Sequence, residues 1–337
     1  MWAAAGIAGR SWAGFVVKLG MNAADLLRLL TCPICRDSDL GGLNEELPDG
    51  VLRCSRCHAS YPVRDGIPIL LPPGLDTSYI DDEVGHLHQH KRRQADWFDR
   101  EVAAEFEIAR PAGAPLAYQW LMAEKFRRSV AFLPPLAGTT VIDACCGSGM
   151  DAEFLARQGA KVIALDISEG CARRARQRAA RFDLDYLVVV GDVEHLPIRT
   201  GSVDVSYVHD GLHHLTEPML GVRELARVAR SAVSVNEPAD ALGTQVAVRL
   251  GISSNDESAG NRVARLNAEG LCRELQSAGF RVYARRYLMY YKHEPGRVMR
   301  LLSRPAVHYV YRWAARLANV ALGRWGNKLQ VTAVRAG

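Results

Sequence analysis

The sequence lacks any uninterrupted run of about 18 apolar residues, so it predicts no segment that crosses a membrane. It also lacks a large excess of charge of either sign, because 42 lysines and arginines face 37 acids, for a formal net charge of +5. That balance permits an anionic partner without requiring one. The length of 337 residues suffices for one large domain together with a small one.

A disulfide framework is missing as well, although the chain has eight cysteines. Four of them form two Cys-x-x-Cys pairs in one short segment, and the other four lie singly or adjacent in apolar sequence. This arrangement favours a reducing compartment with one metal site, and we therefore expect a cytoplasmic protein.

Residues 1–30 are expected to be an N-terminal extension followed by a short helix. The first 20 residues faintly resemble a signal peptide, but Arg10 and Lys18 interrupt the apolar stretch and no typical cleavage site follows. Because Met21 opens a stretch that looks like a natural start, residues 1–20 are interpreted as a disordered extension or a misplaced start codon.

Residues 31–73 are predicted to form a zinc ribbon. Two Cys-x-x-Cys pairs are separated by 18 residues, and two knuckles at this spacing can place four thiolates tetrahedrally around Zn²⁺. The segment is too short to fold around its own apolar core, so a structural metal would supply the folding free energy. The alternative is a set of unrelated buried cysteines. The predicted ligands are Cys32, Cys35, Cys54 and Cys57, with His58 as a bystander.

Residues 74–133 are predicted to be a linker followed by a helical lid. His86, His88 and His90 alternate within HLHQHKRRQ, which would suit a second metal site. A solvated linker or helix start is the simpler interpretation, because the sequence offers no further ligand nearby.

Residues 134–337 are predicted to form an α/β domain. Apolar strand-like runs alternate with helical stretches from residue 139 onward, and such βαβ alternation gives a parallel sheet covered by helices on both faces. Two further strands near 281–291 and 329–336 would complete a Rossmann-like, seven-stranded and mainly parallel sheet. Residues 295–326, between them, have the pattern of a basic amphipathic helical insertion.

The first strand of this domain ends in an acid and a glycine-rich loop, VIDACCGSGMDAEF. The loop satisfies the G-x-G-x-x-G/A pattern of dinucleotide sites, and Asp166 ends the next strand where a ribose-binding acid belongs. The loop alone therefore leaves an NAD-dependent oxidoreductase open. Asp143 favours a cationic cofactor instead, because a carboxylate beside the loop would repel a pyrophosphate.

Two later stretches extend the second interpretation. Asp192 ends the third strand, where a carboxylate can accept a hydrogen bond from an adenine amino group. The neighbouring Val193 amide can serve a ring nitrogen, and its side chain can pack on the ring. VHDGLHHL then closes the fourth strand, beside the loop where a reactive group would emerge.

Together these motifs, over residues 139–240, resemble the class I S-adenosylmethionine (SAM) methyltransferases, particularly those that act on quinones and natural products. The resemblance implies that Asp143 orients the methionine end of SAM, that Asp166 holds the ribose hydroxyls, and that the backbone of His209 lines the methionine part. The family's usual third glycine is less regular in this loop. The implied cofactor-binding residues are Asp143, Cys145, Gly147, Gly149, Asp166, Ile167, Asp192, Val193 and His209.

The cysteine-rich segment has a resemblance of its own. CPIC, LRCSRC and YPVRDGIPILLP, within residues 28–73, are similar to the small zinc-ribbon activator subunit of tRNA and protein methyltransferases, fused in this chain to the catalytic domain. The same order of modules occurs in large-subunit rRNA guanine methyltransferases, whose ligand pattern differs.

Three residues are candidates for acid–base or substrate-contacting roles: His213, His214 and Glu237. One of the two histidines can instead be a structural residue at a helix start. Tyr290 and Tyr291 are further candidates. The motifs for amino methylation of a nucleobase and for pyrimidine C5 methylation are missing after the fourth strand, and Cys145 with Cys146 is expected to pack rather than react.

The acceptor is the least determined feature. Residues 281–337 hold twelve lysines and arginines against one acid, with interleaved aromatics, which suits RNA, an anionic membrane surface or an ordinary covering helix. The leading hypothesis is methyl transfer to an oxygen or carbon atom of a small-molecule, sugar or lipid-linked acceptor. The alternatives are an rRNA or tRNA methyltransferase that grips phosphates with the ribbon and the basic C-terminal region, and a non-catalytic zinc-ribbon partner protein.

Overall fold

The computed structural model describes residues 22–41, 49–72, 75, 82–100, 103–239, 241, 245, 249, 266–290 and 295–335. The expectations for residues 1–20, and for the side chains of His86 and His88, lie outside this part of the chain. Within the described residues, no helix is long and apolar enough to cross a membrane.

The N-terminal unit is a short helix followed by a small antiparallel sheet. Helix α1 (Ala23–Leu29) begins at a capping box, in which the Asn22 side chain accepts a hydrogen bond from the Asp25 amide at 2.8 Å. The strands pair in chain order, each antiparallel to the next. They are β1 (Leu40–Gly41), β2 (Gly50–Cys54), β3 (Ser60–Arg64) and β4 (Ile67–Leu70).

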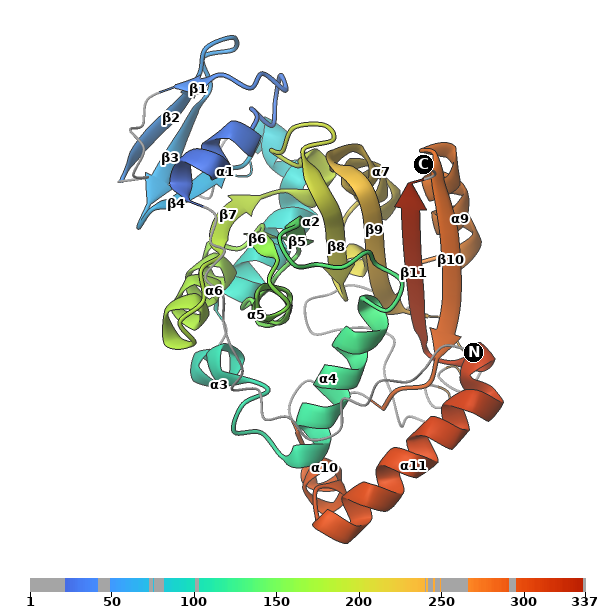
Figure 1. Cartoon of the computed structure of the whole chain (residues 1–337). Helices are drawn as coiled ribbons and strands as arrows, with labels where there is room; N and C mark the ends of the chain where they lie inside the picture. Colours follow the sequence, from blue (N-terminus) through green and yellow to red (C-terminus); the bar gives the residue numbers. More distant parts are fainter. Residues whose placement is uncertain are drawn as a thin grey trace.

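The larger unit is built on seven strands in the spatial order β7-β6-β5-β8-β9-β11-β10 (Figure 1). The first five are parallel, and β11 runs antiparallel to both of its neighbours. The strands are β5 (Thr140–Ala144), β6 (Lys161–Asp166), β7 (Leu187–Gly191), β8 (Val203–His209), β9 (Ala229–Pro238), β10 (Phe280–Tyr287) and β11 (Lys328–Arg335). This confirms the predicted mainly parallel, seven-stranded sheet.

Helices cover both faces of the sheet because the parallel strands are apolar on both sides. In β5, Val141 points into one core cluster, and Ile142 points into the other. Helices α5 (Met150–Arg157) and α6 (Glu169–Arg181) cover the Val141 side, and α7 (Pro218–Val228) and α9 (Ala268–Ser277) cover the opposite side.

The ribbon is continuous with the large sheet. Strand β4 pairs parallel with β7, so the described strands form one eleven-stranded sheet. Leu30 and Leu52 of the ribbon belong to the same core cluster as Ile142 of the large sheet. This pairing also covers the β7 edge of the large sheet, whose backbone groups would otherwise be unpaired.

The remaining helices gather beyond the carboxyl ends of the parallel strands, where α4 and the C-terminal helices lie in Figure 1. The segment predicted to be a linker and helical lid contains three helices. They are α2 (Asp82–Asp99), α3 (Ala104–Ala109) and α4 (Leu116–Ser129). The basic insertion forms α10 (Arg297–Leu302) and α11 (Pro305–Leu322).

Candidate active site

The glycine-rich loop joins β5 to α5 through three residues with positive φ. They are Cys145 at 57°, Gly147 at 54° and Gly149 at 78°. A Cβ on Gly149 would lie 2.7 Å from the Tyr186 hydroxyl oxygen, so only glycine fits there. A Cβ on Gly147 would meet no atom within 4 Å, so the backbone of Gly147 borders open space. The loop therefore closes against α6 on one side and offers its backbone on the other.

Two buried carboxylates flank this loop. Asp166 accepts hydrogen bonds from the Gly147 amide at 2.8 Å and from the Ser168 amide at 3.0 Å. Asp143 is 1% exposed, and its Oδ2 has no hydrogen-bond partner among the described residues. Burial and the nearby negative charges of Asp151 and Asp166 hold the pKa of Asp143 well above its ordinary value. A buried acid in these surroundings is complementary to a cationic ligand.

The predicted adenine-binding residues lie at the end of β7. Asp192 is buried, and its two oxygens accept hydrogen bonds from the Glu194 amide at 2.9 Å and from Lys91 Nζ at 2.6 Å. Val193 packs in the core cluster on the α7 side, which leaves its backbone as the part nearest the site. Ile167 follows Asp166 and is half-buried. No local pattern predicted that Asp192 would pair with a lysine 101 residues earlier in the chain.

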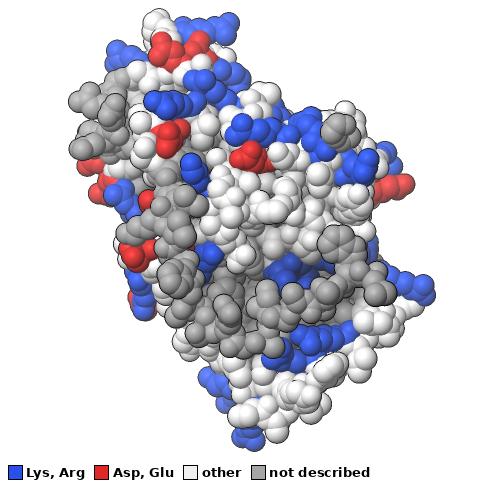
Figure 2. Space-filling model, viewed as in Figure 1, with Lys and Arg blue, Asp and Glu red and all other residues white. Residues whose placement is uncertain are grey.

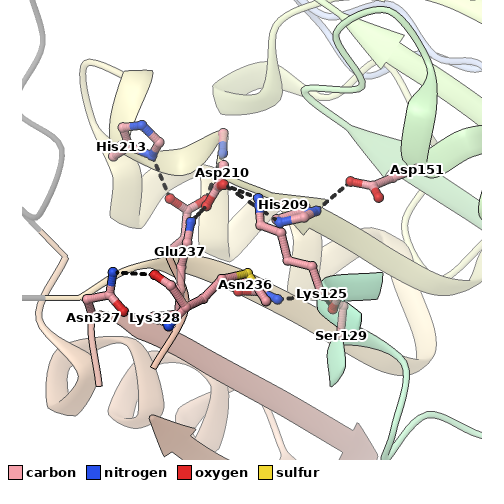
Figure 3. Close-up of polar contacts among 12 residues, drawn as sticks. Lys125, Ser129, Asp151, His209, Asp210, His213, Asn236, Glu237, Asn327 and Lys328 are labelled. Atoms are coloured by element: carbon pink, nitrogen blue, oxygen red, sulfur yellow. Dashed lines mark hydrogen bonds and ion pairs between the residues drawn. The ribbon is translucent and has the colours of Figure 1, made fainter. Parts of the chain in front are cut away.

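A network of charged side chains lies below the loop that follows β8 (Figure 3). His209, the last residue of β8, has its Nδ1 2.5 Å from Asp151 Oδ2 of α5. Asp210 adopts a φ of 51° and bonds to Lys125 Nζ and Lys328 Nζ at 2.5 Å each. Burial opposes ionisation of Asp210, but the two lysines outweigh it and hold its pKa well below the ordinary value.

Glu237 and His213 form a second buried pair. Glu237 is fully buried, and its Oε1 accepts hydrogen bonds from the Gly211 and Leu212 amides at 2.8 Å each. Its Oε2 lies 2.7 Å from His213 Nδ1 (Figure 3). The glutamate thus fixes the β8 loop and orients the histidine ring. Glu237 and His213 are both almost fully buried, and a direct substrate contact by Glu237 stays a prediction.

Helix α2 reaches over the same strand ends with one face. Gln94 Oε1 is 2.9 Å from His214 Nδ1, and Asp99 Oδ1 accepts hydrogen bonds from the Ser168 hydroxyl at 2.6 Å and the Gly170 amide at 2.7 Å. Lys91, three residues before Gln94, pairs with Asp192. These spacings place the anchoring side chains on one side of the helix. The helix therefore lies over the ends of β6, β7 and β8.

The four predicted metal ligands converge in the ribbon. Their sulfur atoms all lie within 4.8 Å of one another, with Cys32 Sγ 3.5 Å from Cys57 Sγ and Cys35 Sγ 3.4 Å from Cys54 Sγ. Four thiolates around a tetrahedral Zn²⁺ require sulfur–sulfur distances of about 3.8 Å. The donor set and its size thus fit zinc. The Tyr61 hydroxyl lies 3.0 Å from Cys32 Sγ and would support that ligand.

The site also contains residues that the motif analysis missed. Lys91, Lys125, Asp151, Asp210 and Lys328 are paired across elements that lie far apart in the sequence. Asp151, two residues after Gly149, and Asp210, directly before Gly211, lie inside motifs that the sequence analysis did highlight. The three lysines carried no local signal.

The topology places the fold in the class I methyltransferases. A dinucleotide-binding domain has six parallel strands, whereas this sheet carries an antiparallel β11 between β9 and β10. The structure of magnesium protoporphyrin IX methyltransferase from Synechocystis, with bound SAH, has the same fold: the TM-score is 0.52 at 20% sequence identity, over 73% of this chain and all of that one. The dehydrogenase interpretation is thereby set aside.

Two stretches of the chain match known family models. Residues 142–234 match the family model "Methyltransferase domain", and residues 24–66 match "Trm112p-like protein". These two stretches are therefore similar to a methyltransferase domain and to a Trm112-like protein, in the order that the resemblances predicted.

Two curated relatives give the degree of similarity. An uncharacterized chloroplastic methyltransferase of Arabidopsis thaliana is 34% identical over 232 residues, 60% of this chain and 59% of that protein. The ubiquinone biosynthesis O-methyltransferase of Ralstonia nicotianae is 30% identical over 159 residues, 46% of this chain and 61% of that protein. The chain spans about three fifths of the length of these relatives.

Proposed function

We propose that the protein is a SAM-dependent methyltransferase. The observation that carries this proposal is the buried Asp143 carboxylate, which has an oxygen without a hydrogen-bond partner among the described residues and lies beside the open backbone of Gly147. The ammonium group of SAM would supply the missing counter-charge, whereas a pyrophosphate would add to the negative charge already present. The proposed cofactor residues are the nine predicted from the motifs, with Val193 and His209 acting through their backbones.

The chain's own contribution to the reaction is to hold the cofactor, to orient the acceptor and to exclude water. SAM supplies an activated methyl group, so positioning of the acceptor provides most of the rate. The lid helix α2 covers the strand ends and keeps water from the methyl group. Ribose hydroxyls would bond to Asp166, whose pKa is raised by burial in the absence of a ligand.

His213 is the proposed base where the acceptor is a hydroxyl or a weak carbon acid. Its Nδ1 is held by Glu237, so Nε2 is the atom that would take the proton from the acceptor. Glu237 is then a positioning residue. His214 is paired with Gln94 of the lid, and we propose that it couples lid closure to the β8 loop.

The acceptor proposed is an oxygen or carbon atom of a small-molecule, sugar or lipid-linked compound. Relatives named for ubiquinone O-methylation and for demethylmenaquinone methylation support this class. The RNA alternative required the ribbon and the basic C-terminal region to act together on phosphates. The ribbon lies at the β7 end of the sheet and α11 lies near the β10 end, which does not favour a joint grip. The partner-protein alternative, a non-catalytic chain that binds SAM or nothing, is disfavoured by the complete set of cofactor motifs.

We also propose that the ribbon binds one structural Zn²⁺ through its four cysteines. The metal would fix the two knuckles of the ribbon. Because β4 pairs with β7, it would also stabilise the β7 edge of the sheet, which Asp192 directly follows.

The function is tested by methyl transfer from radiolabelled SAM into an extract of the native host, separated into RNA, polar and solvent-extractable fractions. Label in either RNA-free fraction is expected, and it should disappear with the Asp143→Asn variant. Label confined to RNA would overturn the proposed acceptor class. Absence of label together with absence of calorimetric SAM binding would revive the partner-protein alternative.

A further inference from the structure

Helix α11 carries its apolar face outward. Its outward-facing side chains are strongly exposed, with Val320 86%, Leu317 65%, Val310 64% and Trp313 50% accessible. These residues are spaced three, four and three apart, so they form one stripe along the helix (the α11 stripe). A covering helix normally buries such a stripe and exposes its polar side. In α11 the apolar stripe is exposed instead.

The inward side of α11 explains why the helix does not roll over. Asn319 bonds to both the amide and the carbonyl of Leu288, at 2.9 and 3.0 Å, at the end of β10. His308 is 7% exposed and packs edge-to-face against Trp120 of α4 at 6.3 Å between ring centroids, and Tyr311 does the same at 5.4 Å. These contacts fix the α11 stripe in its outward orientation.

The charge around the stripe has one sign. Residues 295–337 contain no aspartate or glutamate, whereas the helical region has arginines at 297, 300, 304, 312, 316 and 324. Figure 2 shows uncharged surface with blue side chains on either side over this end of the molecule, and no red there. The neighbouring helix α10 adds Val298 and Leu301, each 52% exposed. An exposed apolar patch of this extent, rimmed by cations, marks an interaction surface.

We propose that α10 and α11 dock the protein onto an anionic lipid surface, with the α11 stripe in the headgroup–acyl boundary and the arginines on lipid phosphates. An interfacial helix has this combination of a wide apolar face, an aromatic anchor and flanking basic residues. RNA does not fit, because valine and leucine side chains offer phosphates and base edges no hydrogen bonds. A second copy does not fit, because two cationic surfaces would face each other.

Helix α11 lies close to the end of the sheet that carries the proposed cofactor site. Strand β11 begins opposite Pro238 at the carboxyl end of β9, and α11 joins it through the turn at Gly323–Trp325. The docked helix would therefore turn the carboxyl ends of the parallel strands, and the Asp143 site with them, toward the bilayer. This inference goes beyond the proposed function and is tested without it.

The test is flotation of the full-length protein with vesicles of phosphatidylcholine, with and without phosphatidylglycerol. Binding is expected with phosphatidylglycerol and is expected to weaken in high salt. The Leu317→Glu/Val320→Glu variant should lose about tenfold or more of its partition coefficient, because two charges would enter the apolar boundary. The Arg300→Glu/Arg304→Glu variant should lose a similar factor on phosphatidylglycerol vesicles.

The matched control is Val51→Glu, since Val51 is 48% exposed on the ribbon, far from α11. It should bind vesicles like the unaltered chain. Circular dichroism checks that each variant is folded, and loss of a vesicle-induced blue shift of tryptophan emission in Trp313→Phe gives a second readout. Binding that is unchanged by both double variants would overturn the proposal. So would binding to an RNA oligonucleotide but not to vesicles, or a dimer that Leu317→Glu/Val320→Glu dissociates in sedimentation.

Discussion

At the scale of single residues, the site contains an unfavourable charge that the chain tolerates. Asp143 is buried near the negative charges of Asp151 and Asp166, and its Oδ2 has no hydrogen-bond partner among the described residues. Because its pKa is raised in the folded state, the folded chain binds a proton more tightly than the unfolded chain. The free energy of unfolding therefore decreases as pH rises from the unfolded pKa through the folded pKa. Such strain is common where a ligand supplies the missing partner.

Asp143→Asn is expected to separate stability from binding. The variant mimics the protonated acid, so at neutral pH its melting temperature without ligand should equal or exceed that of the unaltered chain. Its affinity for S-adenosylhomocysteine should fall by about tenfold or more, because a charge-assisted contact is lost. Thermal denaturation and isothermal titration calorimetry measure the two effects.

The control for this change is Asp185→Asn, an aspartate on the surface after α6. It should alter neither quantity. An Asp143→Asn variant that binds S-adenosylhomocysteine as tightly as the unaltered chain would remove Asp143 from the cofactor site.

At the scale of elements, the ribbon and the large sheet depend on each other. Strand β4 pairs with β7, and Arg36 of the first knuckle bonds to the Leu196 carbonyl at 2.8 Å and to Glu224 of α7 at 2.8 Å. The ribbon therefore contacts the segment that follows Asp192. A change in the ribbon should reach the cofactor site through this edge.

Cys54→Ser is expected to remove the metal and to destabilise this edge. The loss in the free energy of unfolding should be about 3–5 kcal/mol, because metal binding supplies folding free energy to the ribbon. Elemental analysis should find one zinc per unaltered chain and much less in the variant, and chelation should lower the melting temperature of the unaltered chain only. Cys272→Ala, which alters a cysteine of α9 outside the cluster, should keep its zinc. Full zinc content in Cys54→Ser would contradict the four-cysteine site.

At the scale of the whole molecule, one partly buried carboxylate ties three distant segments together. Asp210 at the end of β8 pairs with Lys125 of α4 and with Lys328 at the start of β11 (Figure 3). Burial and the positive charge of Lys125 lower the pKa of Lys328, so the lysines also oppose each other. The lid region, the central sheet and the C-terminal strand are thus linked by one network of ion pairs, in which Asp210 is the shared counter-charge.

Asp210→Asn is expected to cost about 3–5 kcal/mol of unfolding free energy, since it leaves two buried ammonium groups with one counter-charge fewer. Because the folded pKa of Asp210 is lowered, its contribution is complete above the unfolded value of about 4 and is lost as pH falls below it. The unaltered chain should therefore lose stability in acid more steeply than the variant, which chemical denaturation over a pH series measures. Adding Lys328→Met to Asp210→Asn should recover part of the loss; a double variant no more stable than the single one would argue against the shared counter-charge.

The sequence alone determined the features that depend on local spacing. The glycine loop, the acids at the ends of β5, β6 and β7, the two cysteine knuckles and the alternation of strands and helices are all set by residues close together in the chain. The tertiary structure decided which side chains from distant segments pair with one another. Lys91 meets Asp192 across 101 residues, and His213 meets Glu237 across 24, because strand ends that are distant in sequence meet at one edge of the sheet. In the same way, a periodic pattern shows that α11 has an apolar face, but only its packing through Asn319 and His308 decides that this face points outward.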